Sequence, residues 1–135
     1  MTRDRVIRGA LWASVPLNLL GVLLFAPPAL GYGADSLPIP APRFYAAQIA
    51  LTIALFGGVY AWLARQPRID RPLVVVGALG KLGFFALFVA YWAAGDLPGS
   101  VVPQAAPDLA LALVFLWWAR GERRETTAGL PIPAS

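Results

Sequence analysis

The chain has 135 residues, of which 59% are hydrophobic and only 13% are charged, and its net charge is +4. Soluble domains carry about 25% charged residues, so this composition cannot cover a water-exposed surface and indicates an integral membrane protein. The sequence contains no cysteine and no histidine, which excludes disulfides, thiolate or His-ligated metal centres, and thiol or imidazole catalysis. We therefore expect no cofactor, no bound metal and a non-enzymatic role.

The basic residues predict the membrane topology. Ten of the eleven are arginines, and nine of these lie in three short clusters, at 3–8, 65–71 and 120–124, between apolar runs. Four spans place all three clusters on one side, which the positive-inside rule assigns to the cytoplasm. We expect both termini in the cytoplasm, a multi-pass protein of a bacterial cytoplasmic (inner) membrane in contact with the lipid bilayer, and no nucleic-acid binding.

Four apolar runs predict an all-α bundle of four transmembrane helices, because each run is long enough to cross about 30 Å of hydrocarbon. The bundle is expected to form one domain, residues 1–125, followed by a flexible tail at 126–135. The expected helices cover about residues 8–26, 44–64, 72–94 and 101–119.

The first run is expected to end at Pro27 and Pro28, before a proline-rich extended loop that reaches Pro42. A cleaved signal peptide would begin in the same way. Pro16 predicts a kink in this helix. The Asn18 amide then either satisfies the backbone freed by Pro16 or reaches a neighbouring helix.

Two apolar runs carry small residues at every fourth position, a pattern that lets another helix approach closely. These helix-packing residues are Ala46, Ala50, Ala54 and Gly58 in the second run, and Ala86, Ala90 and Ala94 in the third. Gln48 and Thr52 lie on the opposite face of the second run, so both faces of this helix are expected to contact protein. Tyr60 near its end fits an aromatic belt at the membrane interface. The two small-residue faces predict a homo-oligomer or a larger membrane complex.

The last run allows two interpretations. If it begins near Val101, Ser100 caps the helix and Asp108 lies within the membrane beside a kink at Pro107. If it begins at Pro107, only about 13 residues remain before Arg120, and Asp108 is a first-turn acid near the interface. We favour the longer helix because the shorter one does not cross the hydrocarbon.

Lys81 is the only lysine, and it lies in the middle of the third apolar run. Counting 1.5 Å per residue from the nearest arginine places Lys81 and Asn18 about 15 Å into the membrane. The same count places Asp108 at about 18 Å and Thr52 at about 20 Å, so four helices offer polar groups near one level. This midplane polar cluster comprises Lys81, Asp108, Asn18, Thr52, Gln48 and Gln104.

Lys81 and Asp108 are the only opposite charges in this cluster. Because an unpaired charge in hydrocarbon is costly, we expect the two side chains to form an ion pair. One interpretation of the pair is structural, as a contact that fixes the register of two helices. The other is functional, as part of a polar cavity that binds or moves a ligand.

The motif Leu-Gly-Lys-Leu-Gly-Phe-Phe at 79–85, followed by an aspartate in the last helix, resembles small uncharacterised four-helix inner-membrane proteins of bacteria. The resemblance covers most of the chain and implies the same topology without implying an activity. The two halves also resemble each other, with Tyr-Ala-Trp-Leu-Ala-Arg at 60–65 and Leu-Trp-Trp-Ala-Arg at 116–120. This similarity predicts two parallel helical-hairpin repeats, although a shared composition would produce it equally well.

These observations favour a small non-catalytic membrane protein that acts as an accessory or self-assembling subunit. The alternative is a small carrier, or a protein that binds a lipophilic or ionic ligand in a midplane polar cavity. A second alternative is a membrane enzyme acting on a lipid-like substrate, with Lys81 and Asp108 as its acid–base pair.

Overall fold

A computed structural model describes residues 2–33, 37 and 40–128, and the side chains of these residues up to Gly121. The helices are α1 (Arg3–Leu30), α2 (Arg43–Arg65), α3 (Arg71–Ala93), the 3₁₀ helix η2 (Gly99–Ala105) and α4 (Ala106–Ala128). Four helical segments are long and apolar enough to cross a membrane, the last of them running from Gly99 to Gly121. The predicted all-α fold with four spans is therefore confirmed.

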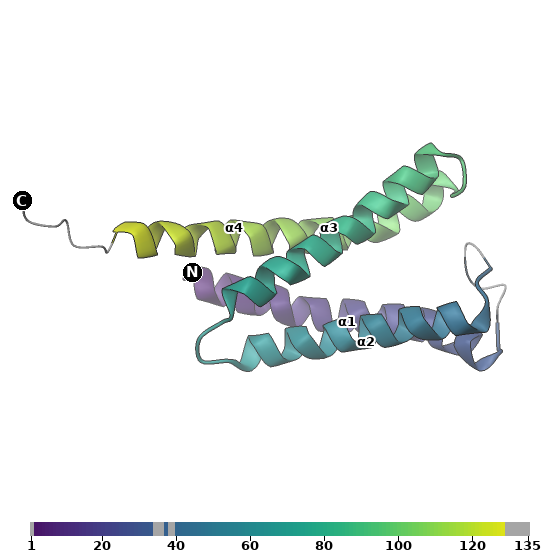
Figure 1. Cartoon of the computed structure of the whole chain (residues 1–135), viewed down its shortest axis with the longest axis horizontal. Helices are drawn as coiled ribbons and strands as arrows, with labels where there is room; N and C mark the ends of the chain where they lie inside the picture. Colours follow the sequence, from purple (N-terminus) through teal and green to yellow (C-terminus); the bar gives the residue numbers. More distant parts are fainter. Residues whose placement is uncertain (1, 34–36, 38–39, 129–135) are drawn as a thin grey trace, which may run out of the picture.

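The four helices form two hairpins. Figure 1 shows α1 lying along α2, and α3 lying along η2 and α4. The hairpins lie close together at the end that carries the N-terminus and the connection between α2 and α3, and they diverge toward the opposite end (Figure 1). We call the first end the arginine-bearing end, because the clusters at 3–8, 65–71 and 120–124 lie there.

The hydrophobic core lies at the arginine-bearing end. Its largest fully buried side chains are Trp118, Tyr60 and Phe115. All four helices contribute to this core, whose buried members are Ile7, Ala10, Leu11, Tyr60, Leu63, Ala64, Ile69, Val74, Ala78, Phe115, Trp118 and Ala119. Close packing of these side chains holds the two hairpins together at this end only.

Polar contacts reinforce the same end. The Arg8 guanidinium donates hydrogen bonds to the carbonyls of Ala64 (2.8 Å) and Pro67 (3.0 Å), which ties α1 to the end of α2. Arg71 Nε donates to the Ala119 carbonyl at 2.8 Å and ties α3 to α4. Two arginines of the clusters therefore bind backbone carbonyls of other helices, a role that the charge pattern did not predict.

The two hairpins are also joined directly at this end. Trp118 Nε1 on α4 donates a hydrogen bond to Asp4 Oδ1 on α1 at 3.1 Å. The Arg3 guanidinium lies over the Trp117 ring, with 4.8 Å between its carbon and the ring centroid, which is within the range of a cation–π interaction. These contacts link the N-terminus of the chain to its last helix.

The expected end of the first helix was wrong. Helix α1 continues through Pro27 and Pro28 to Leu30, although each proline removes a backbone N–H donor and crowds the carbonyl four residues earlier. The carbonyls of Pro28 and Pro27, in the last turn of the helix, accept hydrogen bonds from the N–H groups of Gly31 (3.0 Å) and Tyr32 (2.8 Å). Gly31 has a φ of 92°, so this is a glycine-dependent helix end of the Schellman type. Of the expected loop, residues 34–36 and 38–39 lie outside the described residues.

The last helix combines the two interpretations of the sequence. The longer span is confirmed, because the helical segment begins at Gly99, but its first part is the 3₁₀ helix η2 and the α-helix starts only at Ala106. Ser100 does not cap it, since it lies within η2 and the cap position is Pro98. Helix α4 also continues beyond 119 to Ala128, so residues 126–128, which we assigned to the tail, are helical. Residues 129–135 lie outside the described residues.

The small residues of α2 and α3 differ in their contacts. On α2, Ala46 is buried and Ala50 is half-buried, whereas Ala54 and Gly58 are exposed. The second series is exposed throughout, with Ala86 and Ala90 on α3 and Ala94 at its C-cap. The close approach of α1 and α2 uses other glycines: a Cβ on Gly57 would lie 3.3 Å from Asn18 Cβ, and one on Gly21 would lie 3.2 Å from Ile53. Within the described chain, the predicted packing series therefore packs only at Ala46 and in part at Ala50.

Candidate functional site

The predicted ion pair forms in the structure. Lys81 Nζ on α3 lies 2.5 Å from Asp108 Oδ1, in the first turn of α4. The two side chains are not equally enclosed, since Lys81 is 4% exposed and Asp108 is 15% exposed. The pair therefore joins the two helices of one hairpin, with the ammonium group on its covered side and the carboxylate on its more open side.

Tyr60 on α2 covers the ammonium group of Lys81. The Lys81 nitrogen lies 5.1 Å from the centroid of the Tyr60 ring, at a cation–π distance. The ring is 2% exposed, and its hydroxyl donates to the Gly77 carbonyl at 3.4 Å. The expected place of Tyr60 in an interfacial belt was wrong, because its side chain reaches across to α3 in the core.

Gly77 makes room for this tyrosine. A Cβ at Gly77 would lie only 2.8 Å from Tyr60 Cε1 and 3.5 Å from Phe115. Gly77 also lies four residues before Lys81, on the same face of α3. A glycine one turn from the only lysine is the sequence signal that would have indicated a large side chain packed beside the charge.

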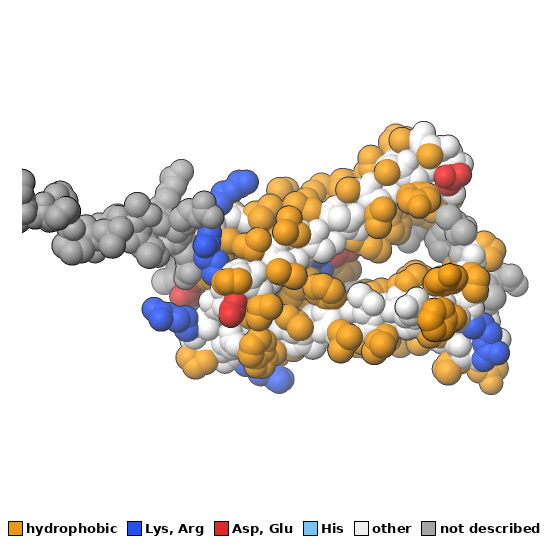
Figure 2. Space-filling model, viewed as in Figure 1, with side chains coloured by type: hydrophobic (Ala, Val, Ile, Leu, Met, Phe, Trp, Pro, Cys, Tyr) orange, Lys and Arg blue, Asp and Glu red, His pale blue; other side chains and the backbone are white. Residues whose placement is uncertain are grey.

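A cleft opens between the two hairpins above the ion pair. Its volume is about 490 Å³, and residues from all four spans line it. Figure 2 shows it as a hollow between the hairpins, walled mainly by hydrophobic side chains. Lys81, Asp108, Asn18 and Tyr60 lie toward its closed end, and we call these four residues the floor of the cleft.

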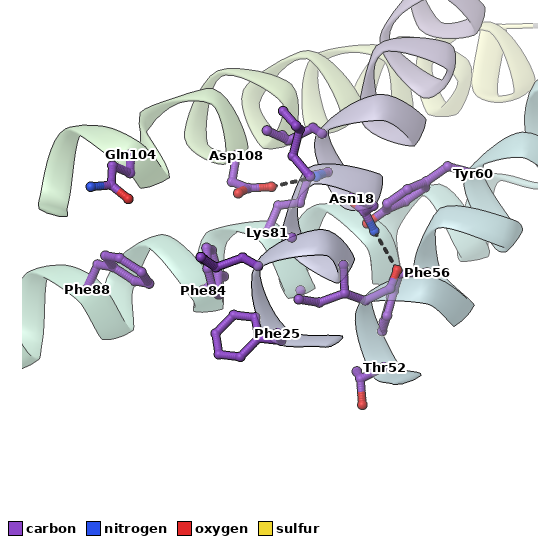
Figure 3. Close-up of a pocket in the computed structure, with 16 residues that line it drawn as sticks. Asn18, Phe25, Thr52, Phe56, Tyr60, Lys81, Phe84, Phe88, Gln104 and Asp108 are labelled. Carbon is purple, nitrogen blue, oxygen red and sulfur yellow. Dashed lines mark hydrogen bonds and ion pairs between the residues drawn. The ribbon is translucent and has the colours of Figure 1, made fainter. Parts of the chain in front are cut away.

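The walls of the cleft are apolar and lie farther from the arginine-bearing end than the floor does. Phe84 and Phe88 follow Lys81 by one and two turns of α3 (Figure 3). Leucine and phenylalanine side chains of α1 and α2 form the opposite wall, which includes Leu20, Leu24, Phe25 and Phe56. The site therefore has a polar end and a longer apolar end.

The structure brings together five of the six residues of the predicted midplane polar cluster. Asn18, Thr52, Lys81, Gln104 and Asp108 line the cleft, whereas Gln48 does not. Figure 3 shows Asp108 between Lys81 and Gln104, and the Thr52 hydroxyl directed away from the ion pair. That hydroxyl donates to the Gln48 carbonyl at 2.8 Å, so Thr52 satisfies its own helix.

Asn18 binds a neighbouring helix. Its Nδ2 group donates a hydrogen bond to the Ile53 carbonyl on α2 at 3.0 Å, which settles the choice left open by the sequence against local repair near Pro16. The contact fixes the level at which α1 and α2 pack, because Gly57 lies directly beneath the asparagine side chain. Asn18 thus has a structural contact and also reaches the cleft.

The polar atoms of the site divide into buried and accessible ones. Among the described residues, every fully buried side-chain nitrogen or oxygen has a hydrogen-bond partner. Asp108 Oδ1 is occupied by Lys81, and no described residue donates to Oδ2. Since Oδ2 is not among the fully buried atoms without a partner, it keeps exposed surface on a side chain that lines the cleft. In the described part of the chain, no group of three His, Cys, Asp or Glu side chains could hold a metal ion.

Comparisons with known protein families, with curated proteins and with solved structures found no match to this chain. The resemblance to bacterial four-helix membrane proteins is therefore supported only as an all-α protein with four candidate membrane spans, and no family is identified.

Proposed function

We propose that this four-span membrane protein is a non-catalytic binding protein that holds a lipophilic ligand between its two hairpins. One observation carries the proposal: the Lys81–Asp108 pair is the floor of a cleft of about 490 Å³. Ligand sites in proteins have volumes of about 300–1,000 Å³, with mostly apolar walls and a few polar groups that fix orientation. The cleft has this size and this division of polar and apolar residues.

The geometry favours a ligand site over a pair that only fixes helix register. A purely structural pair is best enclosed on all sides, because water or lipid that reaches it weakens the pairing or leaves polar atoms unmatched. Asp108 instead keeps an accessible oxygen, and Gln104 lies one turn away along the same side of the cleft. The pair stabilises the fold and also presents a polar group to whatever occupies the cleft.

The same geometry favours binding over catalysis. A general acid or base must be free to exchange its proton with a substrate. Lys81 and Asp108 are engaged with each other, and Tyr60 donates its hydroxyl hydrogen to a backbone carbonyl. This arrangement supports a binding role and argues against the acid–base pair of a membrane enzyme.

We place the protein in a bacterial cytoplasmic membrane with both termini in the cytoplasm. The support is the arginine pattern, since the clusters at 3–8, 65–71 and 120–124 all lie at one end of the four helices. The cleft then opens toward the outer half of the bilayer, and its apolar walls face lipid tails.

A second candidate function, as a self-assembling or accessory subunit, has its own support. Ala86 and Ala90 on α3, with Ala94 at its C-cap, form an exposed face of small residues away from the cleft. Such faces allow close helix contact in membranes. Replacing Ala90 by Leu should weaken an oligomer if this face joins two copies. An unchanged mass of the detergent-solubilised protein by light scattering would remove this candidate.

The main proposal is tested with two glycine variants of α3. Gly80 lines the cleft, and a Cβ there would lie 3.7 Å from Phe56, whereas nothing lies within 4 Å of a Cβ at Gly83. Gly80→Leu should therefore fill part of the cleft, and Gly83→Leu is the matched control on the same helix. Native mass spectrometry of protein purified from its own membranes should find a bound small molecule on the wild type and on Gly83→Leu, but not on Gly80→Leu. Equal retention by all three proteins, or none by the wild type, would contradict the proposal.

A further inference from the structure

We infer that the cleft selects neutral amphiphiles whose polar end donates a hydrogen bond, with long-chain alcohols as the simplest class. The inference rests on the proposed function, because it names the chemistry of a ligand for the same cleft. It follows from which polar atoms of the floor are already engaged and which remain accessible.

The positive charge of the floor is covered. Asp108 Oδ1 and the Tyr60 ring lie on two sides of the Lys81 ammonium group, and the lysine side chain is only 4% exposed. Asp108 is 15% exposed and keeps Oδ2 accessible. The end of the ion-pair dipole that a ligand meets is therefore the carboxylate.

The two other polar groups of the floor each donate one hydrogen bond to the backbone. Asn18 Nδ2 donates to the Ile53 carbonyl, and the Tyr60 hydroxyl donates to the Gly77 carbonyl. Asn18 Oδ1 is an acceptor to which no described residue donates. Asp108 Oδ2 and Asn18 Oδ1 are thus two acceptors of the floor to which no described residue donates, and an acceptor requires a donor from its partner.

Charged ligands fit this floor poorly. An anion would meet the accessible carboxylate oxygen, and like charges repel strongly where little water is present to screen them. A cation at Asp108 Oδ2 would lie close to the Lys81 ammonium group on the other oxygen of the same carboxylate, and the two positive charges would repel each other. A hydroxyl group can donate to Asp108 Oδ2 without disturbing the ion pair.

The apolar end of the ligand is set by the walls. Phe84 and Phe88 on one side, and Leu24 and Phe25 on the other, continue from the floor toward the open end of the cleft. An alkyl or prenyl chain attached to the hydroxyl-bearing carbon would run along these side chains and leave the cleft among the lipid tails. The site therefore matches an amphiphile with a small head and one long chain.

The test compares four photoreactive probes that differ only in the head group. They are diazirine-bearing hexadecan-1-ol, its methyl ether, its sulfate ester and the corresponding trimethylammonium compound. Wild-type protein in lipid nanodiscs is labelled with each probe, and mass spectrometry locates the labelled residues. The alcohol should label the cleft walls at 20–25 and 84–88 at a concentration at least about tenfold lower than the other probes, because a hydrogen bond to a charged acceptor contributes about a factor of ten or more.

The ether is the sharpest control, since it keeps the oxygen and the chain but cannot donate. Equal labelling of the walls by alcohol and ether, or stronger labelling by the sulfate or the ammonium compound, would overturn the ligand class while the proposed binding function stands. No labelling of the walls by any probe would overturn both.

In a Lys81→Met/Asp108→Asn variant, which stays neutral, the preference for the alcohol over the sulfate should fall at least about tenfold. A preference that persists in the folded double variant would also overturn the inference, and the wild-type comparison decides it alone if that variant does not fold.

Discussion

Two groups of different chemistry lie beside Lys81 in its apolar helix, and a glycine makes room for one of them. Asp108 supplies the opposite charge, the Tyr60 ring supplies its π face, and the absence of a side chain at Gly77 makes room for that ring. Removing one partner of a buried pair is far more damaging than replacing both by apolar groups of similar size. The site thus depends on residues acting together.

The first prediction concerns the ion pair. Lys81→Met alone should lower the free energy of unfolding by about 3–5 kcal/mol, because it leaves Asp108 with an unpaired charge. The Lys81→Met/Asp108→Asn double variant should regain most of that loss. Unfolding in mixed detergent micelles measures both, with Asp96→Asn, outside the spans, as a control. A double variant no more stable than the single one would show that the two charges do not stabilise each other.

A second prediction separates two glycines of α3. Gly77→Ala should destabilise the protein by about 1–3 kcal/mol, because the added Cβ forces the Tyr60 ring away from Lys81. A Cβ at Gly83 has no neighbouring atom within 4 Å. Gly83→Ala should therefore leave the free energy of unfolding unchanged or raise it by up to about 1 kcal/mol, since alanine favours a helix. Thermal unfolding of the two variants side by side checks this. Equal effects would mean that Tyr60 does not depend on the space at Gly77.

At the residue scale, the sequence was most informative about depth. Counting residues from the arginine clusters placed Lys81 and Asp108 at nearly the same level, and the two side chains do meet. The same counting could not predict that Tyr60 contacts Lys81. Counting gives the depth of a residue along its own helix, but it does not show which neighbouring helix the side chain faces. It also could not show that the Thr52 hydroxyl would bond to its own helix.

The helices are fastened to one another by arginine contacts at one end. Arg8 binds two carbonyls near the end of α2, whereas the exposed Arg5 side chain makes no hydrogen bond or ring contact among the described residues. The two arginines contribute equally to the charge of the N-terminal cluster. Replacing each arginine separately therefore distinguishes the effect of the Arg8 hydrogen bonds on helix packing from the effect of positive charge on membrane topology.

The third prediction uses this pair. Arg8→Met should speed hydrogen exchange of the backbone amides at 62–66 and lower stability by about 1–3 kcal/mol, because the last carbonyls of α2 lose a charged donor. Arg5→Met should leave both quantities unchanged. If the two variants behave alike, the arginines act only as topology signals.

At the element scale, apolar run length predicted α2 and α3 to within a residue at each end. The predicted end of α1 was wrong, although proline usually ends a helix. The helix runs through Pro27 and Pro28, and their carbonyls accept hydrogen bonds from the N–H groups of Tyr32 and Gly31. The 3₁₀ form of η2 was also unpredicted, since hydropathy reports the length of an apolar run and not its hydrogen-bond register.

The whole molecule is asymmetric along its long axis. The buried core and the Arg8 and Arg71 contacts lie at one end, while the other end is divided into two hairpins with a cleft between them (Figures 1 and 2). The sequence predicted the two hairpins and offered a polar midplane cavity as one interpretation, but it could not predict a mainly apolar cleft between the hairpins. Which faces of two hairpins meet depends on contacts among all four helices, such as those between Trp118 and Asp4.

The fourth prediction is the orientation of the molecule. The chain has no cysteine, so single-cysteine variants report one position each. Thr2→Cys and Gln66→Cys should react with a membrane-impermeant thiol reagent only after the cytoplasmic side is exposed, and Asp96→Cys should react in intact cells. The opposite pattern, or residues 2 and 66 on different sides, would contradict the proposed topology.

The most direct test of the site uses the fact that Lys81 is the only lysine. In protein carrying ¹⁵N at lysine Nζ and ¹³C at aspartate Cγ, reconstituted in lipid bilayers, solid-state NMR should show one ammonium signal with a strong dipolar coupling to an aspartate carbon. That coupling should disappear in Asp108→Asn. An ammonium signal with no such coupling in the wild type, or one that keeps its coupling in Asp108→Asn, would show that Lys81 does not meet Asp108 at the floor of the cleft.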